Sequence, residues 1–350
     1  MKDQKPERTE LHTVQADLAT QLQGVGGPDK VWVACSGGLD SSVLLFLLNE
    51  LQRKVGTFEL GVLHVNYALR GAESDRDENL VREAAEKYGR ELRVLKIDPK
   101  QHPLQKTGIQ EWARTIRYEW FMEQRGPRDW IAMAHHRNDW VETIFARLCR
   151  GHSLMAVSGM QILHEQIWRP LLHYTQHQLE AWGQEYGIAF GEDSSNQGLD
   201  YTRNRLRHKI LPELETLFPG LAQNIWLHAQ DLQDCLGFVQ YQYPDMVFED
   251  TLRLNELQAR PSFLARHEIG RYLALHYPGV HVSRDLLLTI HEAMVQGKAW
   301  TGMLGPGTQA VCRDGVLSIV RNQMPVSERW QQFRAALLDE SWDIWPPAAP

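Results

Sequence analysis

The chain has 350 residues and a formal net charge of −7, with 43% hydrophobic and 23% charged residues. This composition is ordinary for a globular protein, and the length allows two domains because single cores seldom grow beyond about 250–300 residues. No run of about 18 apolar residues is present, which excludes a membrane-spanning helix, and the scattered cysteines exclude a local zinc ribbon or a disulfide scaffold.

The N-terminal part, residues 1–25, is predicted to contain one amphipathic helix near residues 9–23. It lacks the apolar core of a signal peptide, so we expect a cytoplasmic protein. The negative net charge gives nucleic-acid binding no general support, so any contact with phosphates must come from local basic clusters.

Residues 26–214 alternate between short apolar runs and longer amphipathic segments. Buried strands are predicted at 31–36, 59–66, 91–98 and 129–136. Helices are predicted at 41–52, 73–89, 109–125 and 140–151. Strands that alternate with helices of this length form a parallel sheet with right-handed crossovers. We therefore predict an α/β domain whose parallel sheet is covered by helices on both faces.

The strand signal fades after this domain. Residues 215–325 predict a smaller, mainly helical domain that ends in a hairpin around Asp314 and Gly315, a typical two-residue turn. Residues 326–350 form a tail rich in tryptophan.

A glycine pair lies between the first predicted strand and the first helix of the domain. Adjacent glycines let the backbone turn sharply, and their amides join those of the helix N-terminus as donors for an anion. Serine hydroxyls add further donors, so the segment predicts a pyrophosphate site. The predicted site comprises Ser36, Gly37, Gly38, Leu39, Asp40, Ser41 and Ser42.

This SGGLDSS segment differs from a Walker A loop, because it has no lysine and its glycines are adjacent. Asp40 would repel phosphates unless a cation lies between them, so we predict that Asp40 holds Mg²⁺ and acts in catalysis. The alternative is an ordinary strand–helix turn in which Asp40 is merely favoured by the helix dipole.

Polar residues also follow the other predicted strands. The carboxyl ends of parallel strands meet at one edge of the sheet, so His64 and Asn66 are expected to join the nucleotide site. Asp139 and Glu142 share a helix face with the preceding His135. We predict Asp139 as a second metal ligand and Asp139 and Glu142 as catalytic residues, one of them the general base. The opposite, core-facing stripe comprises Val141, Ile144, Phe145 and Leu148.

Two basic segments are candidates for phosphate contacts. Arg114 and Arg117 can face the same way on one predicted helix, and Arg117 is the candidate to stabilise developing phosphate charge. In the RNRLRHK segment at 203–209, Arg203, Asn204 and Arg207 are predicted to contact tRNA, although phosphates of ATP are an alternative. For both segments the simpler alternative is a solvated helix face.

These blocks together carry a resemblance. SGGLDSS resembles the PP-loop of N-type ATP pyrophosphatases, which split ATP between the α and β phosphates. The segments LHVNYALRGAESDRDENLVREAAEKYG, QEWARTIRY, AHHRNDWVETIFARLCRG and RPLL with DSSNQGLDYTRNRLRHKILPELE are similar to blocks of the tRNA(Ile)-lysidine synthetases, and the chain resembles their short form. They extend over about residues 31–215.

The resemblance implies an adenine nucleotide alpha hydrolase-like fold with ATP and Mg²⁺ as cofactors. It further implies that O2 of the anticodon cytidine of tRNA(Ile), in a CAU anticodon, attacks the α-phosphorus of ATP. The amine of free lysine then replaces AMP at C2. Homodimer formation is left open.

Three positions depart from the family pattern. The paired acids read Asn138 and Asp139, Trp140 replaces a smaller polar residue, and Tyr67 stands where a histidine is expected. Loss of one carboxylate is expected to weaken a metal or ammonium site, unless Asn138 serves as a helix N-cap. Two alternatives follow: another PP-loop enzyme with a different substrate, or a decayed paralogue that only binds nucleotide or tRNA.

Overall fold

The computed structural model describes residues 11–23, 26–97, 109–152, 157–191, 202–244, 246, 248, 250–277, 282–305 and 307–321. Two compact units divide the chain. Unit 1 consists of Met1–Glu142 and Gln161–Ala222, and unit 2 consists of Thr143–Met160 and Gln223–Pro350. Between its two main domains the sequence predicts one boundary, at residue 214, whereas the chain passes between the two units three times. The predicted tail at 326–350 lies outside the described residues.

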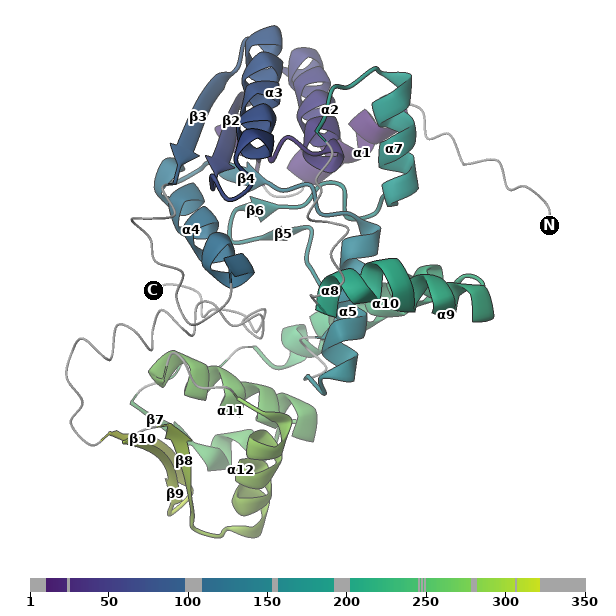
Figure 1. The fold of residues 1–350 in the computed structure, drawn as a ribbon. Coiled ribbons are helices and arrows are strands. Elements are labelled where there is room, and N and C mark those ends of the chain that lie inside the picture. Colours follow the sequence, from purple (N-terminus) through teal and green to yellow (C-terminus); the bar gives the residue numbers. More distant parts are fainter. Residues whose placement is uncertain are drawn as a thin grey trace. The chain divides into compact units, whose positions relative to one another are not determined.

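Unit 1 is built around a six-stranded sheet (Figure 1). The strands, in spatial order, are β3 (Glu91–Lys96), β2 (Glu59–Asn66), β1 (Lys30–Ala34), β4 (Trp130–Ala132), β6 (Ile167–Trp168) and β5 (Leu163–His164). All neighbours pair in parallel except β5 and β6. The predicted parallel sheet is confirmed, and the two short strands β5 and β6 are additional.

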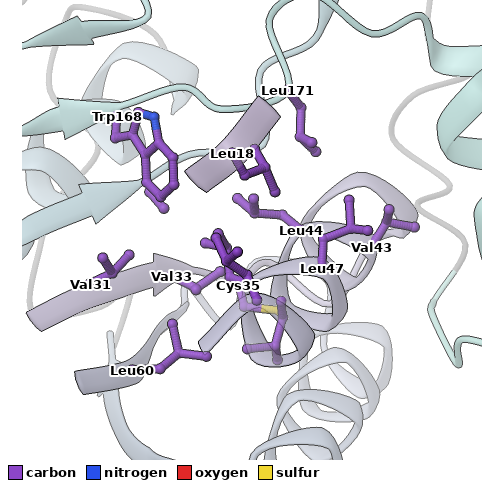
Figure 2. Close-up of a cluster of buried hydrophobic side chains, with 14 of the residues drawn as sticks. Leu18, Val31, Val33, Cys35, Val43, Leu44, Leu47, Leu60, Trp168 and Leu171 are labelled. Carbon is purple, nitrogen blue, oxygen red and sulfur yellow. The ribbon is translucent and has the colours of Figure 1, made fainter. Parts of the chain in front are cut away.

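Helices cover both faces of this sheet. They are α1 (Leu11–Gln23), α2 (Leu39–Val55), α3 (Ala72–Tyr88), α4 (Ile109–Gln124) and α7 (Gln176–Glu185), and α5 (Arg137–Cys149) begins in unit 1. The larger core joins α1, α2, α3 and α7 to one face of the sheet, and Figure 2 shows its leucines and valines around Trp168. A second core, with Phe121 of α4, covers the other face. The prediction that helices cover both faces of the sheet is therefore confirmed.

Side chains of β1 alternate between these two cores, as the period of a strand requires. Val31 and Val33 enter the larger core, whereas Trp32 enters the smaller one. A Cβ at Gly61 of the adjacent strand would overlap the Trp32 ring, so glycine is needed there. Both faces of β1 are thus fixed by packing before any polar group is considered.

The strand order creates a switch point beside β1. The chain leaves β1 towards β2 and β3, then returns to pair β4 with the other edge of β1. Ligands of open parallel sheets bind at the carboxyl ends of strands where the order reverses. The residues that follow β1 and β4 are therefore the first place to look for a site.

Unit 2 contains α11 (Ser262–His276), α12 (Arg284–Gln296) and most of α10 (Leu221–Gln242). Its antiparallel sheet has the order β7 (Thr251–Arg253), β10 (Val316–Arg321), β9 (Thr308–Arg313) and β8 (Trp300–Gly305). The predicted hairpin is confirmed, since Asp314 and Gly315 both adopt positive φ between β9 and β10. The sequence did not predict β7 and β8. No helix in the described ranges is long and apolar enough to cross a membrane.

A buried ionic network fixes α11 within unit 2. Glu268 is fully buried and accepts hydrogen bonds from Arg260 at 3.2 Å and Arg271 at 2.8 Å. Both arginines also donate to backbone carbonyls, of Pro244 and Met246 respectively. The network therefore ties the chain that precedes β7 to the middle of α11.

Acidification is expected to destabilise unit 2 through His267, which neighbours this network. Burial, assisted by the charge of Arg271, lowers the pKa of His267 to about 4. An unfolded histidine has a pKa near ~6.5, so the unfolded state binds more protons between these values. This contribution is complete above about pH 6.5 and is lost as pH falls towards 4, by up to roughly 3 kcal/mol. Urea unfolding at several pH values measures it, and His267→Gln should remove most of that slope.

Candidate active site

The loop that follows β1 is held in one conformation by its own side chains. Ser41 Oγ accepts a hydrogen bond from the Ser36 amide at 3.1 Å and donates to the Gly38 carbonyl at 3.0 Å. Ser36 Oγ accepts from the Gly38 amide at 3.3 Å, and Gly37 adopts a positive φ of 91°. The hydroxyls that the sequence assigns to phosphate therefore also bind the loop together.

Helix α2 begins at the end of this loop and supplies unpaired amides. Gly38 is the N-cap, and the first intrahelical bond runs from the Ser42 amide to the Gly38 carbonyl at 3.1 Å. The amides of Leu39, Asp40 and Ser41 therefore have no acceptor within the helix. Together with the positive end of the helix dipole, they form a site that favours an anion.

His64 and Asn66 lie at the end of β2, beside this loop. His64 is buried, and its Nδ1 lies 2.8 Å from the carbonyl oxygen of Cys35, which makes Nδ1 the protonated nitrogen. Burial lowers the pKa of His64, which favours the neutral ring, and Nε2, which can then accept a hydrogen bond, has no partner among the described residues. His64 is thus equipped to contact a donor such as an adenine amino group.

The amide side chain of Asn66 is occupied within the protein. It donates to Glu78 at 2.7 Å and to Asp75 at 3.2 Å, and its oxygen accepts from the Ala68 amide at 2.9 Å. These bonds order the turn between β2 and α3. Asn66 therefore shapes the rim of the site in this structure, and direct contact with a nucleotide stays a prediction.

His136 connects the loop to the residues that follow β4. Its side chain is 1% exposed, and Nε2 lies 3.6 Å from Oδ2 of Asp40 and 3.4 Å from Oδ2 of Asp139. Burial lowers the pKa of His136, but Asp139 and the hydrogen bond to Asp40 outweigh burial and raise it above its usual value. From the sequence, the adjacent His135 and His136 could be metal ligands, with a packing or substrate-orienting role expected for at least one of them. The available signal for His136 was its position directly before α5.

Asp139 and Glu142 lie one turn apart on α5 and bind the same two arginines. Arg207 approaches both carboxylates at 2.6 Å, and Arg203 approaches Asp139 at 3.0 Å and Glu142 at 3.1 Å. Glu142 is nearly fully buried, with 3% of its side chain exposed. The four residues form a charge-balanced cluster next to His136, which we term the carboxylate–arginine cluster.

The charges within the cluster indicate whether one of its carboxylates can act as a general base. Burial opposes ionisation of Asp139, but His136, Arg203 and other cations outweigh it and lower the pKa of Asp139 below its usual range. A carboxylate with a lowered pKa is a weak base. Asp139 is therefore better suited to holding a cation than to removing a proton.

The segment that supplies these arginines has basic side chains of two kinds: some bind the carboxylates of the cluster and others are exposed. It consists of α8 (Thr202–Arg205) and a π-helical turn (Leu206–Ile210), a rare geometry that is frequent at functional sites. Arg203 and Arg207 are directed to the carboxylates, whereas Arg205 and Lys209 are exposed. Contact of Arg203, Asn204 and Arg207 with tRNA stays a prediction, and Arg205 and Lys209 are candidates that the sequence analysis did not choose.

Two expectations about α5 are wrong. Asn138 is not the N-cap, because the helix begins at Arg137, and the Asn138 oxygen accepts instead from the Gln176 amide in the first turn of α7. Leu148 is 55% exposed, so the core-facing stripe ends before it.

Trp140 departs from the family pattern, in which a smaller polar residue is expected. Its side chain is buried and stacks on His173, which explains why a large apolar residue fits at this position.

Helix α4 brings a third group of polar residues to the same end of the sheet. Arg114 and Arg117 both lie near the ring of Tyr118, with guanidinium carbons at 5.1 and 5.7 Å from its centre. Nε of Arg117 is buried and has no hydrogen-bond partner among the residues that the structure describes. Tyr67, the third departure from the family pattern, follows β2 and donates to the Ala113 carbonyl of α4 at 2.8 Å, so it joins the end of β2 to this helix.

Comparisons with known proteins identify the family of this chain. A family described as PP-loop domain matches residues 10–214. The tRNA(Ile)-lysidine synthase of Chlorobaculum tepidum is 30% identical over 87% of this chain and 95% of its own length. That of Porphyromonas gingivalis is 34% identical over 65% of this chain but only 49% of its own length, so this chain spans about half of the longer relatives.

The fold comparison is consistent with the sequence comparison. The U34-tRNA thiolase NcsA from Methanococcus maripaludis shares the fold at a TM-score of 0.53, with 17% identity, over 64% of this chain and 80% of its own length. The PP-loop match extends over more than half of the chain, and the Chlorobaculum relative is matched over nearly its whole length. This chain belongs to the tRNA(Ile)-lysidine synthase family of PP-loop proteins.

Proposed function

We propose that this protein adenylates a cytidine in the CAU anticodon of tRNA(Ile) with ATP and then replaces AMP with lysine, forming lysidine. One observation carries the proposal. His136 joins Asp40, in the first turn of α2, to Asp139 of the carboxylate–arginine cluster, in a chain that matches a lysidine synthase over 95% of that relative's length. A phosphate site and a charged amino-acid site are what these two steps require, and ATP and tRNA both meet in the cytoplasm.

In the first step, the cytidine O2 forms a bond to the α-phosphorus while the bond to pyrophosphate breaks. The amides of Leu39, Asp40 and Ser41 are placed to receive the negative charge of that pyrophosphate. The cytidine must leave its stack for its C2 edge to be reached. Arg117, whose Nε has no partner within the described part of the chain, is a candidate to stabilise charge on the α-phosphate.

Asp40 and Asp139 are suited to Mg²⁺. Their carboxylates flank the same nitrogen of His136, and hard oxygen ligands are what Mg²⁺ prefers. Within the described ranges no group of three or more His, Cys, Asp or Glu residues forms a complete metal site. That suits an ion held by one or two carboxylates together with substrate phosphates. When bound, the ion would neutralise phosphate charge.

In the second step, the lysine ε-amine forms a bond to C2, AMP departs with O2, and the amine loses its extra protons. The ammonium has a reference pKa near ~10.4, so a base must act. Glu142 is the better candidate, because the pKa of Asp139 is lowered. The cluster carries both charges that a zwitterionic amino acid needs: Asp139 and Glu142 for an ammonium, and Arg203 and Arg207 for an anion.

Lysine incorporation tests the proposal directly. The full chain is incubated with ATP, labelled lysine and tRNA bearing a CAU anticodon, and label in tRNA is measured together with AMP and pyrophosphate. Label incorporation with equal amounts of AMP and pyrophosphate is expected. A tRNA in which only the anticodon cytidine is changed is the matched control and should take up no label. Release of AMP only with another nucleophile would assign a different substrate, and ATP binding without pyrophosphate release would identify a decayed enzyme.

A further inference from the structure

One buried carboxylate of α3 contacts the loop that follows β1, and the proposed reaction does not use it. Asp77 has 8% of its side chain exposed. Its carboxylate accepts hydrogen bonds from Arg70 at 3.0 Å and from Arg76 at 2.9 Å. Two cations on different segments thus hold Asp77 in one place, because a buried carboxylate would otherwise be poorly solvated.

Asp77 lies in direct contact with the glycine that turns the loop. A Cβ at Gly37 would fall 2.9 Å from the carbonyl oxygen of Asp77 and 3.1 Å from its Cβ. Gly37 also has a φ of 91°, a conformation that other residues rarely adopt. The loop therefore turns where it does partly because α3 leaves room for a glycine alone.

Gly191, which follows α7 in the chain, completes this arrangement. The Gly191 amide donates to the Gly37 carbonyl at 2.8 Å. A Cβ at Gly191 would overlap Oδ1 of Asp77. The Asp77 carboxylate thus sets how closely Gly191 can approach the loop, and Gly191 in turn fixes the direction of the Gly37 carbonyl.

The direction of that carbonyl determines where the loop amides point. In a trans peptide, the carbonyl of one residue and the amide of the next point in opposite directions. With the Gly37 carbonyl held towards Gly191, the Gly38 amide is directed away from it, and Gly38 is the N-cap from which α2 starts. A rotation of this one peptide would turn the Gly38 amide away from Ser36 Oγ, to which it donates at 3.3 Å, and so disturb the loop directly before the first turn of the helix.

We propose that Asp77 is a positioning residue, which holds the Gly37 peptide so that the amides at the start of α2 face the diphosphate of ATP. The inference rests on the proposed function of this loop and deepens it. Asp77 touches no substrate in this role. It acts through Gly37 and Gly191, and it sets the affinity for phosphates without affecting the recognition of adenosine.

Binding of three ligands separates this role from a general loss of structure. Calorimetry with the full chain measures the Kd of ATP with Mg²⁺, of pyrophosphate with Mg²⁺, and of adenosine. Asp77→Ala is expected to raise the Kd of ATP and pyrophosphate about tenfold, as misplaced groups do, and to leave that of adenosine unchanged. Asp77→Asn, which keeps an oxygen for the arginines, should recover most of the affinity. Glu86→Ala, an exposed carboxylate on the same helix, is the matched control.

A second variant keeps the test valid if Asp77→Ala does not fold. Gly191→Ala leaves Asp77 in place but forces the two apart, and it should give the same selective loss for ATP and pyrophosphate. Unchanged ATP affinity in folded variants, or an equal loss for adenosine with a lower melting temperature, would overturn the inference. If the wild-type chain binds ATP but transfers no lysine, the proposed substrate fails while the inference stands. If it binds neither ATP nor pyrophosphate, both fail.

Discussion

Replacing Asp40 with alanine is expected to lower pyrophosphate release from ATP by about a thousandfold, the scale seen when one charge-stabilising group is lost from an active site. Asp40 lies in the first turn of α2, among the amides that face the phosphates, and its carboxylate is half-exposed beside His136. Without it, Mg²⁺ would lose a ligand and the phosphates would lose a neutralising ion. Steady-state release of pyrophosphate in the presence of tRNA and lysine is the measurement.

The control separates chemistry from helix stability. Asp285 occupies the second position of α12, as Asp40 does in α2, and both interact favourably with a helix dipole. Asp285→Ala removes the same kind of charge from a helix start in unit 2 and should leave the rate unchanged. If Asp40→Ala retained more than a tenth of the rate, its assignment as a metal ligand would have to be abandoned.

Replacing Glu142 with glutamine is expected to have the second largest effect, because it unbalances the carboxylate–arginine cluster. Arg203 and Arg207 would then face Asp139 alone, and breaking partly buried ion pairs is expected to reduce the free energy of unfolding by roughly 2–3 kcal/mol. The proposed base would also be lost, so lysine transfer should fall by about a hundredfold or more. Denaturant unfolding and single-turnover lysine transfer measure the two effects separately.

Restoring the charge balance distinguishes the two roles of Glu142. In the double variant Glu142→Gln with Arg203→Gln, one negative and one positive charge are removed together. Stability should recover in part, because the remaining pair of Arg207 and Asp139 is matched, while lysine transfer should stay low. Recovery of both quantities would show that Glu142 acts only through the structure of the cluster and takes no proton.

Much of unit 1 could be predicted because its signals are local. The strands β1, β2 and β3 are apolar runs of five to eight residues bounded by turns, and helices of more than ten residues separate them. By contrast, β5 and β6 have two residues each, too few for any periodic pattern. The strand β7, with three residues, was missed for the same reason.

The site shows the same limit at the level of single residues. Periodicity correctly indicates that Asp139 and Glu142 share a face of α5, since they bind the same arginines. It cannot indicate that Arg203 and Arg207 are those partners, because more than 60 residues separate the two segments and the pairing depends on the tertiary fold. Similarly, nothing local connects Asp77 with Gly37 and Gly191, which meet only when α3 packs on the loop.

The division between the two units inside α5 has a practical consequence for dissecting the protein. A fragment that ends at residue 222 would keep every residue of the candidate site, yet it would also keep 143–160, which belongs to unit 2. In the full chain, Gln233 of α10 donates to the carbonyls of Ser158 and Met160, both at 3.0 Å, and the fragment would leave these carbonyls without their donor. Expression of an isolated nucleotide-binding half should therefore replace 143–160 with a short polar connection, since simple truncation invites aggregation.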